Sequence, residues 1–453
     1  MKSLAIIGAG PKAVAVHAKL RAMQHEGLEV PDVTVFDPQG VGGNWRACGG
    51  WTDGRQQLGT SPDKDMGFPY RTRIVGGHNA AVDRQLLTVG WVQFLTETDR
   101  YASWIDRGHP NPPHHLWASY LQWVAYKTAM NVVPARITSV EAGNSGGSDG
   151  AAGADRSKRG GWTLHGELTD GTPTTTHADS VLVTGPGPSN RKISDLPGVL
   201  SLAEFWQRIS QKSLPAASRV VVIGCGESAA SVLDQLIRRD IVSAICVSPL
   251  ATMYSRGESQ FENELYTDPR KWALLSDEAR RDFIHRTDRG VLSVKVQQAL
   301  HADDRVEHRK GIVSRVELEQ SSFGPDVLRV HISDEVQGDY SETCDVVIDA
   351  RGGCPLWFTD LFSDQTMADL KEAVGGELTA AAVEQSIAPD MSVAGLGSTL
   401  FVPSLAGMKH GPGFANLSCL GELSDRIIAG LGVGELAVDH ARQDAQQSEE
   451  ARR

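Results

Sequence analysis

Close cysteine pairs are missing from this chain of 453 residues, although six cysteines are present. The cysteines lie far apart and no C-x-x-C sequence occurs, whereas dithiol redox enzymes use such a pair. This spacing argues against a disulfide reductase. It favours free, buried thiols in a reducing compartment, and we therefore expect a cytoplasmic protein.

Net positive charge and long apolar runs are missing as well. The formal net charge is −12, which argues against nucleic acid or an anionic membrane as the main partner, because both require a basic surface. No apolar run approaches the roughly 20 residues of a membrane span, so we expect none. The first apolar residues are too few for a signal peptide and lead directly into Gly8 and Gly10, which predicts an opening strand.

Two glycine-rich turns are the most informative feature that is present. Each follows a short β-branched run (4–7 and 220–223), has the spacing G-x-G-x-x-A, and precedes a helical pattern (14–20 and 230–237). A dinucleotide needs this strand–turn–helix context, because its pyrophosphate lies on a helix N-terminus against bare glycine backbone. The candidate pyrophosphate-binding residues are Gly8, Gly10 and Pro11 in the first turn, and Gly224, Gly226, Glu227 and Ser228 in the second. One such turn alone also occurs in ordinary α/β folds, but two predict a flavoprotein that binds FAD and a nicotinamide dinucleotide.

The end of each second strand distinguishes the two nucleotides. Asp37 ends the strand after the first turn, where a carboxylate accepts hydrogen bonds from a ribose, as FAD requires. Ser248 ends the corresponding strand after the second turn. A hydroxyl there does not repel a 2′-phosphate, so NADPH is favoured over NADH. Arg256 is the nearest candidate partner for that phosphate, and an ordinary surface arginine is an equally good interpretation.

The expected fold class is α/β, with two Rossmann-like dinucleotide-binding domains, the second inserted in the first, and a small, mainly helical substrate region. Residues 142–161 are rich in glycine, serine and alanine, which predicts a surface loop rather than a domain boundary. The predicted units are an FAD-binding domain at 1–195 and 345–435, an NADPH-binding domain at 196–344, a helical insertion at 263–303 and a disordered tail at 436–453.

Two polar segments are candidates for substrate binding. Lys64 stands among proline, methionine, phenylalanine and tyrosine, which is unusual because lysine is mostly exposed unless paired. It either holds a substrate carboxylate or forms an ion pair with Asp63 or Asp65. The segment 255–266, which contains Asn263, has the mixture of polar and aromatic residues of a substrate pocket, or equally of a polar loop.

Two glycine-containing segments are candidates for flavin contact. The first, residues 42–45, includes Asn44 and Trp45, and small residues with an aromatic suit packing near a flavin. The second begins at His410 and precedes a final helix, so its backbone N–H groups would face a flavin or substrate. A buried tryptophan in a surface loop and a capped helix are equally good alternatives.

Together these segments resemble the N-hydroxylating flavin monooxygenases, which add oxygen to the side-chain amine of lysine or ornithine for hydroxamate siderophores. The resemblance is nearly collinear from the first turn to about Ile428. The motifs that carry it are Gly8-Ala-Gly-Pro, Thr60-Ser-Pro-Asp-Lys-Asp, Gly224-Cys-Gly-Glu-Ser-Ala-Ala, Phe261-Glu-Asn-Glu-Leu-Tyr and His410-Gly with Asn416-Leu-Ser. Longer strings make it strongest with the mycobactin/nocobactin-type L-lysine ε-N-hydroxylases, namely Asp65-Met-Gly-Phe-Pro-Tyr-Arg and Gly411-Pro-Gly-Phe-Ala-Asn-Leu-Ser-Cys-Leu-Gly.

The resemblance implies roles for individual residues. Lys64 matches a lysine that grips the amino-acid carboxylate, Asn263 matches an asparagine that holds the same end, and Ser418 matches a serine of that pocket. Asp288 stands where the wider family has an asparagine that touches substrate, and Gly59 stands where it has a glutamine near the flavin. The remaining candidates for FAD contact are Asn44, Trp45, Leu58, Gly59, His410, Asn416 and Leu417, and Arg351 is a further candidate for NADPH contact.

The resemblance also implies the reaction, in which NADPH reduces FAD, O2 forms a flavin hydroperoxide, and the lysine amine attacks its distal oxygen. The attacking amine must be neutral, so hydrophobic walls are expected to lower its pKa from ~10.4. We expect neither a metal nor a catalytic side chain, since the flavin carries the chemistry. The alternatives are an uncoupled NADPH oxidase, a vestigial flavoprotein, and an oxygenase of ornithine or acylated lysine. A homo-oligomer is left open.

Overall fold

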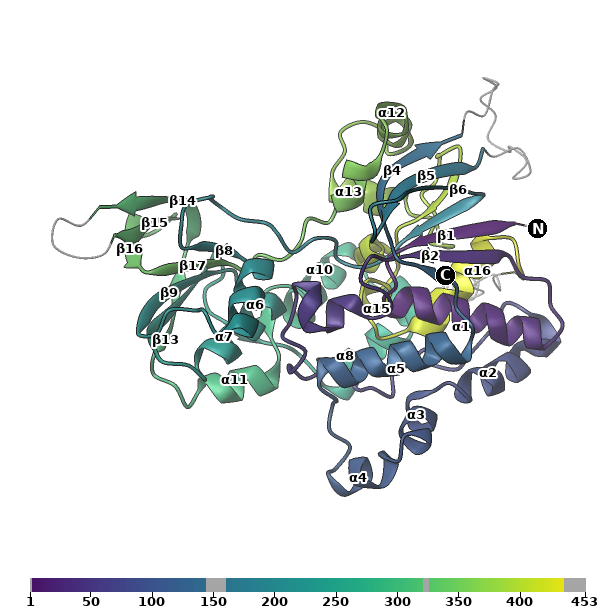
Figure 1. Ribbon diagram of the computed structural model, residues 1–453, viewed down its shortest axis with the longest axis horizontal. Helices are drawn as coiled ribbons and strands as arrows, with labels where there is room; N and C mark the ends of the chain where they lie inside the picture. Colours follow the sequence, from purple (N-terminus) through teal and green to yellow (C-terminus); the bar gives the residue numbers. More distant parts are fainter. Residues whose placement is uncertain (1, 144–159, 321–325, 436–453) are drawn as a thin grey trace, which may run out of the picture.

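The computed structural model describes residues 2–143, 160–320 and 326–435, and its backbone forms two lobes (Figure 1). One lobe carries the first and last described residues, with α1 (Pro11–His25) packed beside α16 (Leu420–Gly430). The other lobe contains α7 (Glu227–Leu236). The expected surface loop lies for the most part outside the described residues, and the expected disordered tail at 436–453 lies wholly outside them.

The first lobe is built on a parallel sheet with strand order β18-β7-β1-β2-β3. Its strands are β1 (Ser3–Ile7), β2 (Asp32–Phe36), β3 (Val132–Val133), β7 (Ser180–Val183) and β18 (Thr399–Phe401). The central strand β1 ends directly before Gly8, so its carboxyl end leads into the first glycine turn and then into α1. The chain leaves this sheet after β7 and returns to it at β18.

The second lobe contains a parallel sheet with strand order β13-β10-β9-β17-β8. Its strands are β8 (Val199–Ser201), β9 (Ser218–Ile223), β10 (Ile241–Ser248), β13 (Val306–Lys310) and β17 (Val346–Asp349). The sequence β9–α7–β10 repeats the β1–α1–β2 arrangement of the first lobe. The two sheets confirm the expected α/β class with Rossmann-like halves.

Strand β17 corrects one expected boundary. We expected the chain to have returned to the first domain at residue 345, but residues 346–349 pair with both β9 and β8 and therefore lie inside the second sheet. All four residues of β17 are buried, as expected of a parallel strand with neighbours on both sides. The chain leaves the second sheet only after Asp349.

Two small antiparallel sheets accompany the parallel ones (Figure 1). One joins the first lobe and consists of β4 (Ala135–Ala142), β5 (Trp162–Leu168) and β6 (Pro173–Ala178). The other joins the second lobe and consists of β14 (Ile312–Glu319), β15 (Val327–Asp334) and β16 (Gly338–Cys344). Ala142 and Trp162 face each other in neighbouring strands, so the glycine- and serine-rich segment connects the strands of one sheet.

The region expected to be helical, 263–303, contains α8 (Gln260–Thr267), α9 (Pro269–Ala273), α10 (Asp277–Thr287) and α11 (Val294–Leu300). A short parallel ladder between β11 (Tyr254–Ser255) and β12 (Val291–Leu292) ties it to the second lobe. Ser259 begins α8 with a capping box, in which its hydroxyl accepts from the Glu262 backbone and the Glu262 carboxylate accepts from the Ser259 backbone. This cap fixes where α8 starts, and hence the position of Asn263.

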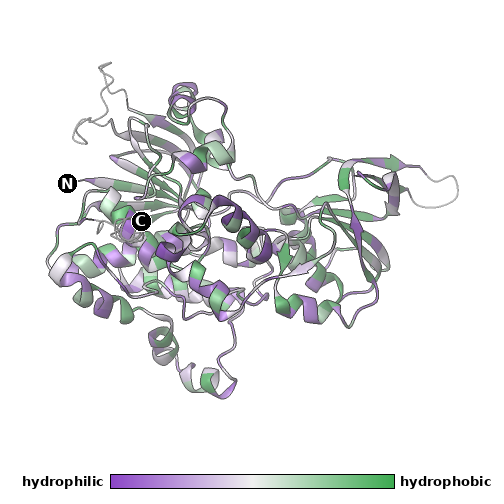
Figure 2. Ribbon diagram, turned by 180° about the vertical axis from the view of Figure 1, so that it is seen from behind, coloured by the Kyte–Doolittle hydropathy of each residue, from purple (hydrophilic) through white to green (hydrophobic). Residues whose placement is uncertain are grey.

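The remaining helices cover the sheets and the space between them (Figure 1). They are α2 (Asn79–Leu87), α3 (Trp91–Glu97), α4 (Tyr101–Asp106), α5 (His114–Lys127), α6 (Leu202–Gln211), α12 (Asp364–Ala373), α13 (Ala380–Ser386), α14 (Gly407–His410) and α15 (Pro412–Ala415). In Figure 2 the central strands of both sheets are largely hydrophobic, whereas the outer helices alternate between hydrophobic and hydrophilic residues. None of the helices in the described ranges is long and apolar enough to cross a membrane.

The five cysteines whose side chains the structure describes are free thiols, as expected. Cys225, Cys246, Cys344 and Cys419 are free and buried, but Cys354 is exposed. Cys354 lies beyond the end of β17, in a segment that no longer has sheet neighbours on both sides. The expectation that the thiols are buried is therefore wrong at this position.

Candidate active site

The first glycine of each nucleotide turn is required by the protein's own backbone. Gly8 has φ 98°, and a Cβ there would lie 2.7 Å from Thr184 Oγ1. Gly224 has φ 110°, and a Cβ there would lie 2.9 Å from the Ala350 carbonyl oxygen. Both positions need a left-handed backbone conformation and a close approach to the next strand of the sheet, which only glycine supplies.

The second glycine of each turn is not required by packing. A Cβ on Gly10 would meet no atom within 4 Å, and one on Gly226 would meet only the Gly290 backbone nitrogen at 3.9 Å. Gly10 and Gly226 are the N-cap residues of α1 and α7, and no side chain accepts a hydrogen bond from the first N–H groups at either cap. Open space beside an uncapped helix N-terminus fits a pyrophosphate. Both turns are therefore suited to the pyrophosphate of a dinucleotide.

The two strand ends beside these turns differ more than the sequence suggested. The Asp37 carboxylate accepts hydrogen bonds from the Ala9 backbone at 2.9 Å and from the Gln39 backbone at 2.8 Å, which holds it beside the first turn. Ser248 is only 2% exposed, and its hydroxyl shares a 3.0 Å hydrogen bond with Nε2 of His308 on the neighbouring strand β13. The hydroxyl is thus held by the neighbouring strand.

The two candidate arginines of the second nucleotide site are both paired. Arg351 forms a bidentate ion pair with Asp349, at 2.5 and 2.8 Å. Arg256 forms a 2.8 Å ion pair with Glu227, the first residue of α7. A Cβ on Gly59 would lie 3.6 Å from Nη1 of Arg256, so this arginine connects the second turn to the Gly59 segment of the first lobe.

Lys64 and Asn263 meet at the junction of the lobes. Nζ of Lys64 donates to Oδ1 of Asn263 at 3.0 Å. Burial lowers the pKa of Lys64. The Asn263 amide is oriented because its Nδ2 donates to the backbone carbonyls of Glu258 and Ser259, at 3.0 and 3.1 Å.

The ion pairs weighed for Lys64 in the sequence are not formed. The Asp65 carboxylate accepts instead from the Tyr70 hydroxyl and the Trp91 backbone, each at 2.7 Å, and Asp63 accepts from Ser61. Both neighbouring acids therefore have other partners. Lys64 is available to an anionic group beside Asn263.

The Ser418 segment approaches the same place from the end of the first lobe. Ser418 is buried, and its backbone N–H donates to Oδ1 of Asn416 at 2.9 Å. The adjacent Cys419 is close enough to Lys64 for the ammonium charge to oppose the rise in thiol pKa that burial causes. Lys64, Asn263 and Ser418, from three distant parts of the chain, are thus gathered in one region.

Asp288 ends α10 close to several cations. Burial raises the pKa of its carboxyl, and the charges of Arg256, Arg289 and Lys12 oppose that rise. The hydroxyl of Tyr266 on α8 donates to Thr287 at 2.8 Å, which ties Asp288 to the helix that carries Asn263. An acid at position 288 is accordingly surrounded by positive charge, which compensates for its burial.

The remaining FAD candidates mostly shape the loops around the first turn. Trp45 packs edge-on against His114 with ring centroids 4.8 Å apart, and the Leu58 backbone is held by Pro112 and Asn111. Nε2 of His410 lies 2.8 Å from the Ile387 carbonyl, and burial lowers the pKa of His410 to about 4, so its ring is neutral at pH 7.

The other three FAD candidates lie at the edges of these loops. Asn44 is exposed near Gly185, where a Cβ would be 3.9 Å from Nδ2 of Asn44. Asn416 uses its side-chain oxygen within its own turn, and Leu417 is half-buried.

Lys12 is a residue that the sequence analysis missed. It lies directly after Pro11 in the first turn, is 7% exposed, and its Nζ donates to the Ala415 carbonyl at 2.7 Å. The sequence pattern that could have identified it is a lysine among apolar residues at the start of a buried helix, where a small or apolar residue would pack more easily. Its partner, 403 positions away, is not evident from the sequence.

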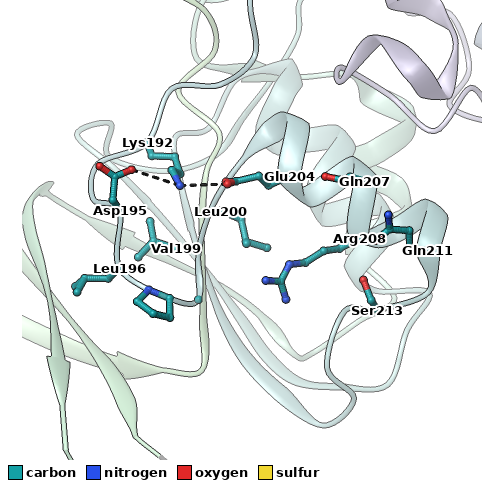
Figure 3. Close-up of a pocket in the computed structure, with 12 residues that line it drawn as sticks. Lys192, Asp195, Leu196, Val199, Leu200, Glu204, Gln207, Arg208, Gln211 and Ser213 are labelled. Carbon is teal, nitrogen blue, oxygen red and sulfur yellow. Dashed lines mark hydrogen bonds and ion pairs between the residues drawn. The ribbon is translucent and has the colours of Figure 1, made fainter.

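A separate cavity of about 610 Å³ lies beside β8 and α6 (Figure 3). Lys192 enters it and forms ion pairs with Asp195 at 3.4 Å and Glu204 at 3.1 Å, while Arg208 lines it from α6. None of the candidate site residues lines this cavity. Within the described residues, no group of three or more histidine, cysteine, aspartate or glutamate side chains is arranged to hold a metal ion.

Comparisons with known proteins identify the family. The family model of L-lysine 6-monooxygenase/L-ornithine 5-monooxygenase matches residues 88–304. L-lysine N6-monooxygenase MbtG of Mycobacterium sp. (strain MCS) is 44% identical over 433 residues, which is 94% of either chain. Lysine monooxygenase NbtG from Nocardia farcinica, whose structure is described as having an unprecedented NADPH domain conformation, is 44% identical with a TM-score of 0.80, covering 94% of this chain and 100% of that one.

A more distant structure shares the fold. The ornithine N-hydroxylase KtzI of Kutzneria sp. 744, described with reduced FAD, NADP+ and L-ornithine, has a TM-score of 0.70 at 17% identity. The match covers 95% of this chain and 99% of that one.

Proposed function

Because the chain belongs to the L-lysine 6-monooxygenase/L-ornithine 5-monooxygenase family, we propose that it is an FAD- and NADPH-dependent L-lysine N-monooxygenase. The observation that carries the choice of lysine is 44% identity over 94% of the chain to an enzyme named for lysine. The product is N-hydroxylysine for the biosynthesis of a hydroxamate siderophore.

The two glycine turns bind the two nucleotides. FAD would lie on the first turn, held by Gly10 at its pyrophosphate and by Asp37 at a ribose, and NADPH would lie on the second turn at Gly226. The open space beside both glycines supports this assignment. When bound, FAD accepts electrons from NADPH and activates O2, which no protein side chain does unaided.

Lys64 and Asn263 hold the carboxylate end of the substrate. An ammonium and an amide in contact present donors to a carboxylate, and such charge-assisted hydrogen bonds are strong. Ser418 lines the same pocket. With the carboxylate fixed, the length of the side chain determines where the amine lies, so ornithine, which is one methylene shorter, fails to reach the flavin.

The substrate amine must lose its proton before it attacks oxygen. Buried surroundings favour the neutral amine, since desolvation disfavours its charged form. A charged Asp288 beside the amine would oppose this shift, because a nearby carboxylate stabilises the ammonium form. Exclusion of water from the pocket also protects the activated oxygen from loss as peroxide.

The requirement for NADPH and the free thiols of the five described cysteines support a cytoplasmic enzyme.

The substrate assignment is tested with purified, FAD-loaded protein supplied with NADPH and O2. Mass spectrometry of products from L-lysine, L-ornithine and α-N-acetyl-lysine should show oxygen added to free lysine alone. Oxygen added only to ornithine or to the acylated lysine would contradict the assignment.

A further inference from the structure

Lys12 is a buried cation without a bonded carboxylate. It is 7% exposed, and its Nζ donates to two uncharged groups, the Ala415 carbonyl at 2.7 Å and the Ser404 hydroxyl at 3.4 Å. Burying a lysine is costly unless its charge and donors are satisfied. A lysine kept at this position therefore indicates a task that an apolar residue does not perform.

One task is to anchor the segment that carries Ser418. Ala415 is the last residue of α15 and immediately precedes Asn416, whose side chain orders the Ser418 backbone. Lys12 belongs to the first turn of α1, next to Gly10 and Pro11. One hydrogen bond thus connects the proposed FAD turn with one wall of the proposed lysine pocket.

A second task concerns Asp288. Burial lowers the pKa of Lys12 to about 8, and the carboxylate charge of Asp288 opposes this effect. Lys12 in turn opposes the rise in the Asp288 pKa. The ammonium and the carboxylate therefore stabilise each other's charge across two segments that are far apart in the chain.

We infer that Lys12 is a positioning residue of the lysine pocket, which anchors the Ala415–Ser418 segment through its hydrogen bond and balances the charge of Asp288. This inference rests on the proposed function. Lys12 does not touch the reacting atoms, so its loss should weaken substrate binding more than it slows the chemical step.

The first test measures the anchor without any catalysis. Hydrogen exchange of the 411–419 amides in the FAD-loaded enzyme should become at least tenfold faster in Lys12→Met. It should stay unchanged in Lys12→Gln, which keeps an N–H donor. Lys2→Met is the matched control, because Lys2 also donates to a backbone carbonyl of the C-terminal segment, at Leu431, but from the start of β1. Equal exchange in Lys12→Met and wild type would overturn the inference, whether or not the enzyme hydroxylates lysine.

The second test measures the charge balance. Lys12→Gln and Asp288→Asn should each raise KM for L-lysine at least fivefold, with a smaller change in kcat. The double variant should be no worse than the poorer single variant, because both charges are then absent. The inference would be overturned if the two substitutions multiplied their effects on KM in the double variant, or if KM were unchanged in Lys12→Gln. A wild-type enzyme that forms no hydroxylamine from lysine would instead contradict the proposed function, while the exchange test would still decide whether Lys12 is an anchor.

Discussion

Nζ of Lys64 lies 3.0 Å from Oδ1 of Asn263, although 199 positions separate the two residues in the chain. Lys64 belongs to a loop of the first lobe, and Asn263 belongs to α8 beside the second lobe. Their contact means that the proposed substrate pocket is complete only when both lobes are in place. It also removes the simplest alternative for Lys64, an ion pair with an adjacent aspartate.

Lys64→Met should raise KM for L-lysine about 10- to 100-fold, because a hydrogen bond to a charged group contributes about 1.5–3 kcal/mol. The rate of NADPH oxidation without substrate should not change, since Lys64 is not placed near the second nucleotide turn. Steady-state kinetics with Lys2→Met as the control variant checks both statements. Unchanged KM and kcat in Lys64→Met would rule out a role in carboxylate binding.

The glycine pair of the first turn allows FAD binding to be separated from folding. Gly10→Ala should leave the free energy of unfolding of the apoprotein within about 1 kcal/mol of wild type, because a Cβ meets open space there. It should weaken FAD binding at least tenfold, since the methyl group occupies the pyrophosphate position. Gly8→Ala should destabilise the apoprotein itself by about 1–3 kcal/mol, because of its positive φ and the nearby Thr184. Equal FAD affinity in Gly10→Ala and wild type would contradict the assignment of this turn.

Asp288→Asn should move the acid limb of the kcat profile, which reports groups in the enzyme–substrate complex, toward lower pH by up to about one unit. A carboxylate near the substrate amine stabilises its ammonium form, so removing that charge lowers the pH at which the amine becomes neutral. A pH–rate series with lysine for both proteins checks this. A large fall in kcat with an unmoved limb would show instead that Asp288 accepts the proton.

His114 should make stability depend on pH. Burial lowers the pKa of His114 to about 4 in the folded protein, and the charge of His115 lowers it further but to a smaller extent. In the unfolded chain the pKa of a histidine is about 6.5. Between these two pH values the unfolded chain binds more protons than the folded protein. The contribution of neutral His114 to the free energy of unfolding is therefore fully present above about pH 6.5 and is lost as the pH falls toward 4. Between pH 7 and 5, wild type should lose up to about 2 kcal/mol more stability than His114→Phe.

Urea unfolding of both proteins at the two pH values measures that difference directly. His410 acts in the same direction, with a pKa of about 4. Asp65 acts in the opposite direction, because burial raises its pKa to about 6. Wild type and His114→Phe both contain His410 and Asp65, so the difference between the two proteins removes the pH dependence that these residues contribute. An identical pH dependence in the two proteins would show that His114 titrates normally.

The features that were predicted well from the sequence depend on residues close together in the chain. The two glycine turns follow from spacing within about ten residues, and the structure shows why each first glycine is required. The position of β17 between β9 and β8 was missed, because the order of parallel strands is set by packing between distant segments. The partner of Ser248 was not evident for the same reason, since His308 lies on the adjacent strand β13.

The candidate pocket shows the same division. The resemblance to the N-hydroxylating monooxygenases singled out Lys64, Asn263 and Ser418, but only the fold brings Lys64 into contact with Asn263. Lys12 was missed, because its burial and its bond to Ala415 depend on the return of the chain to the first lobe near residue 400.

The central claim is that NADPH and O2 are used to hydroxylate lysine. The most direct test measures hydroxylamine formed and NADPH oxidised in one reaction with FAD and L-lysine, with L-ornithine as the control. The account predicts lysine-dependent hydroxylamine near one equivalent per NADPH, and little from ornithine. NADPH oxidation that yields only peroxide in the presence of lysine would contradict it.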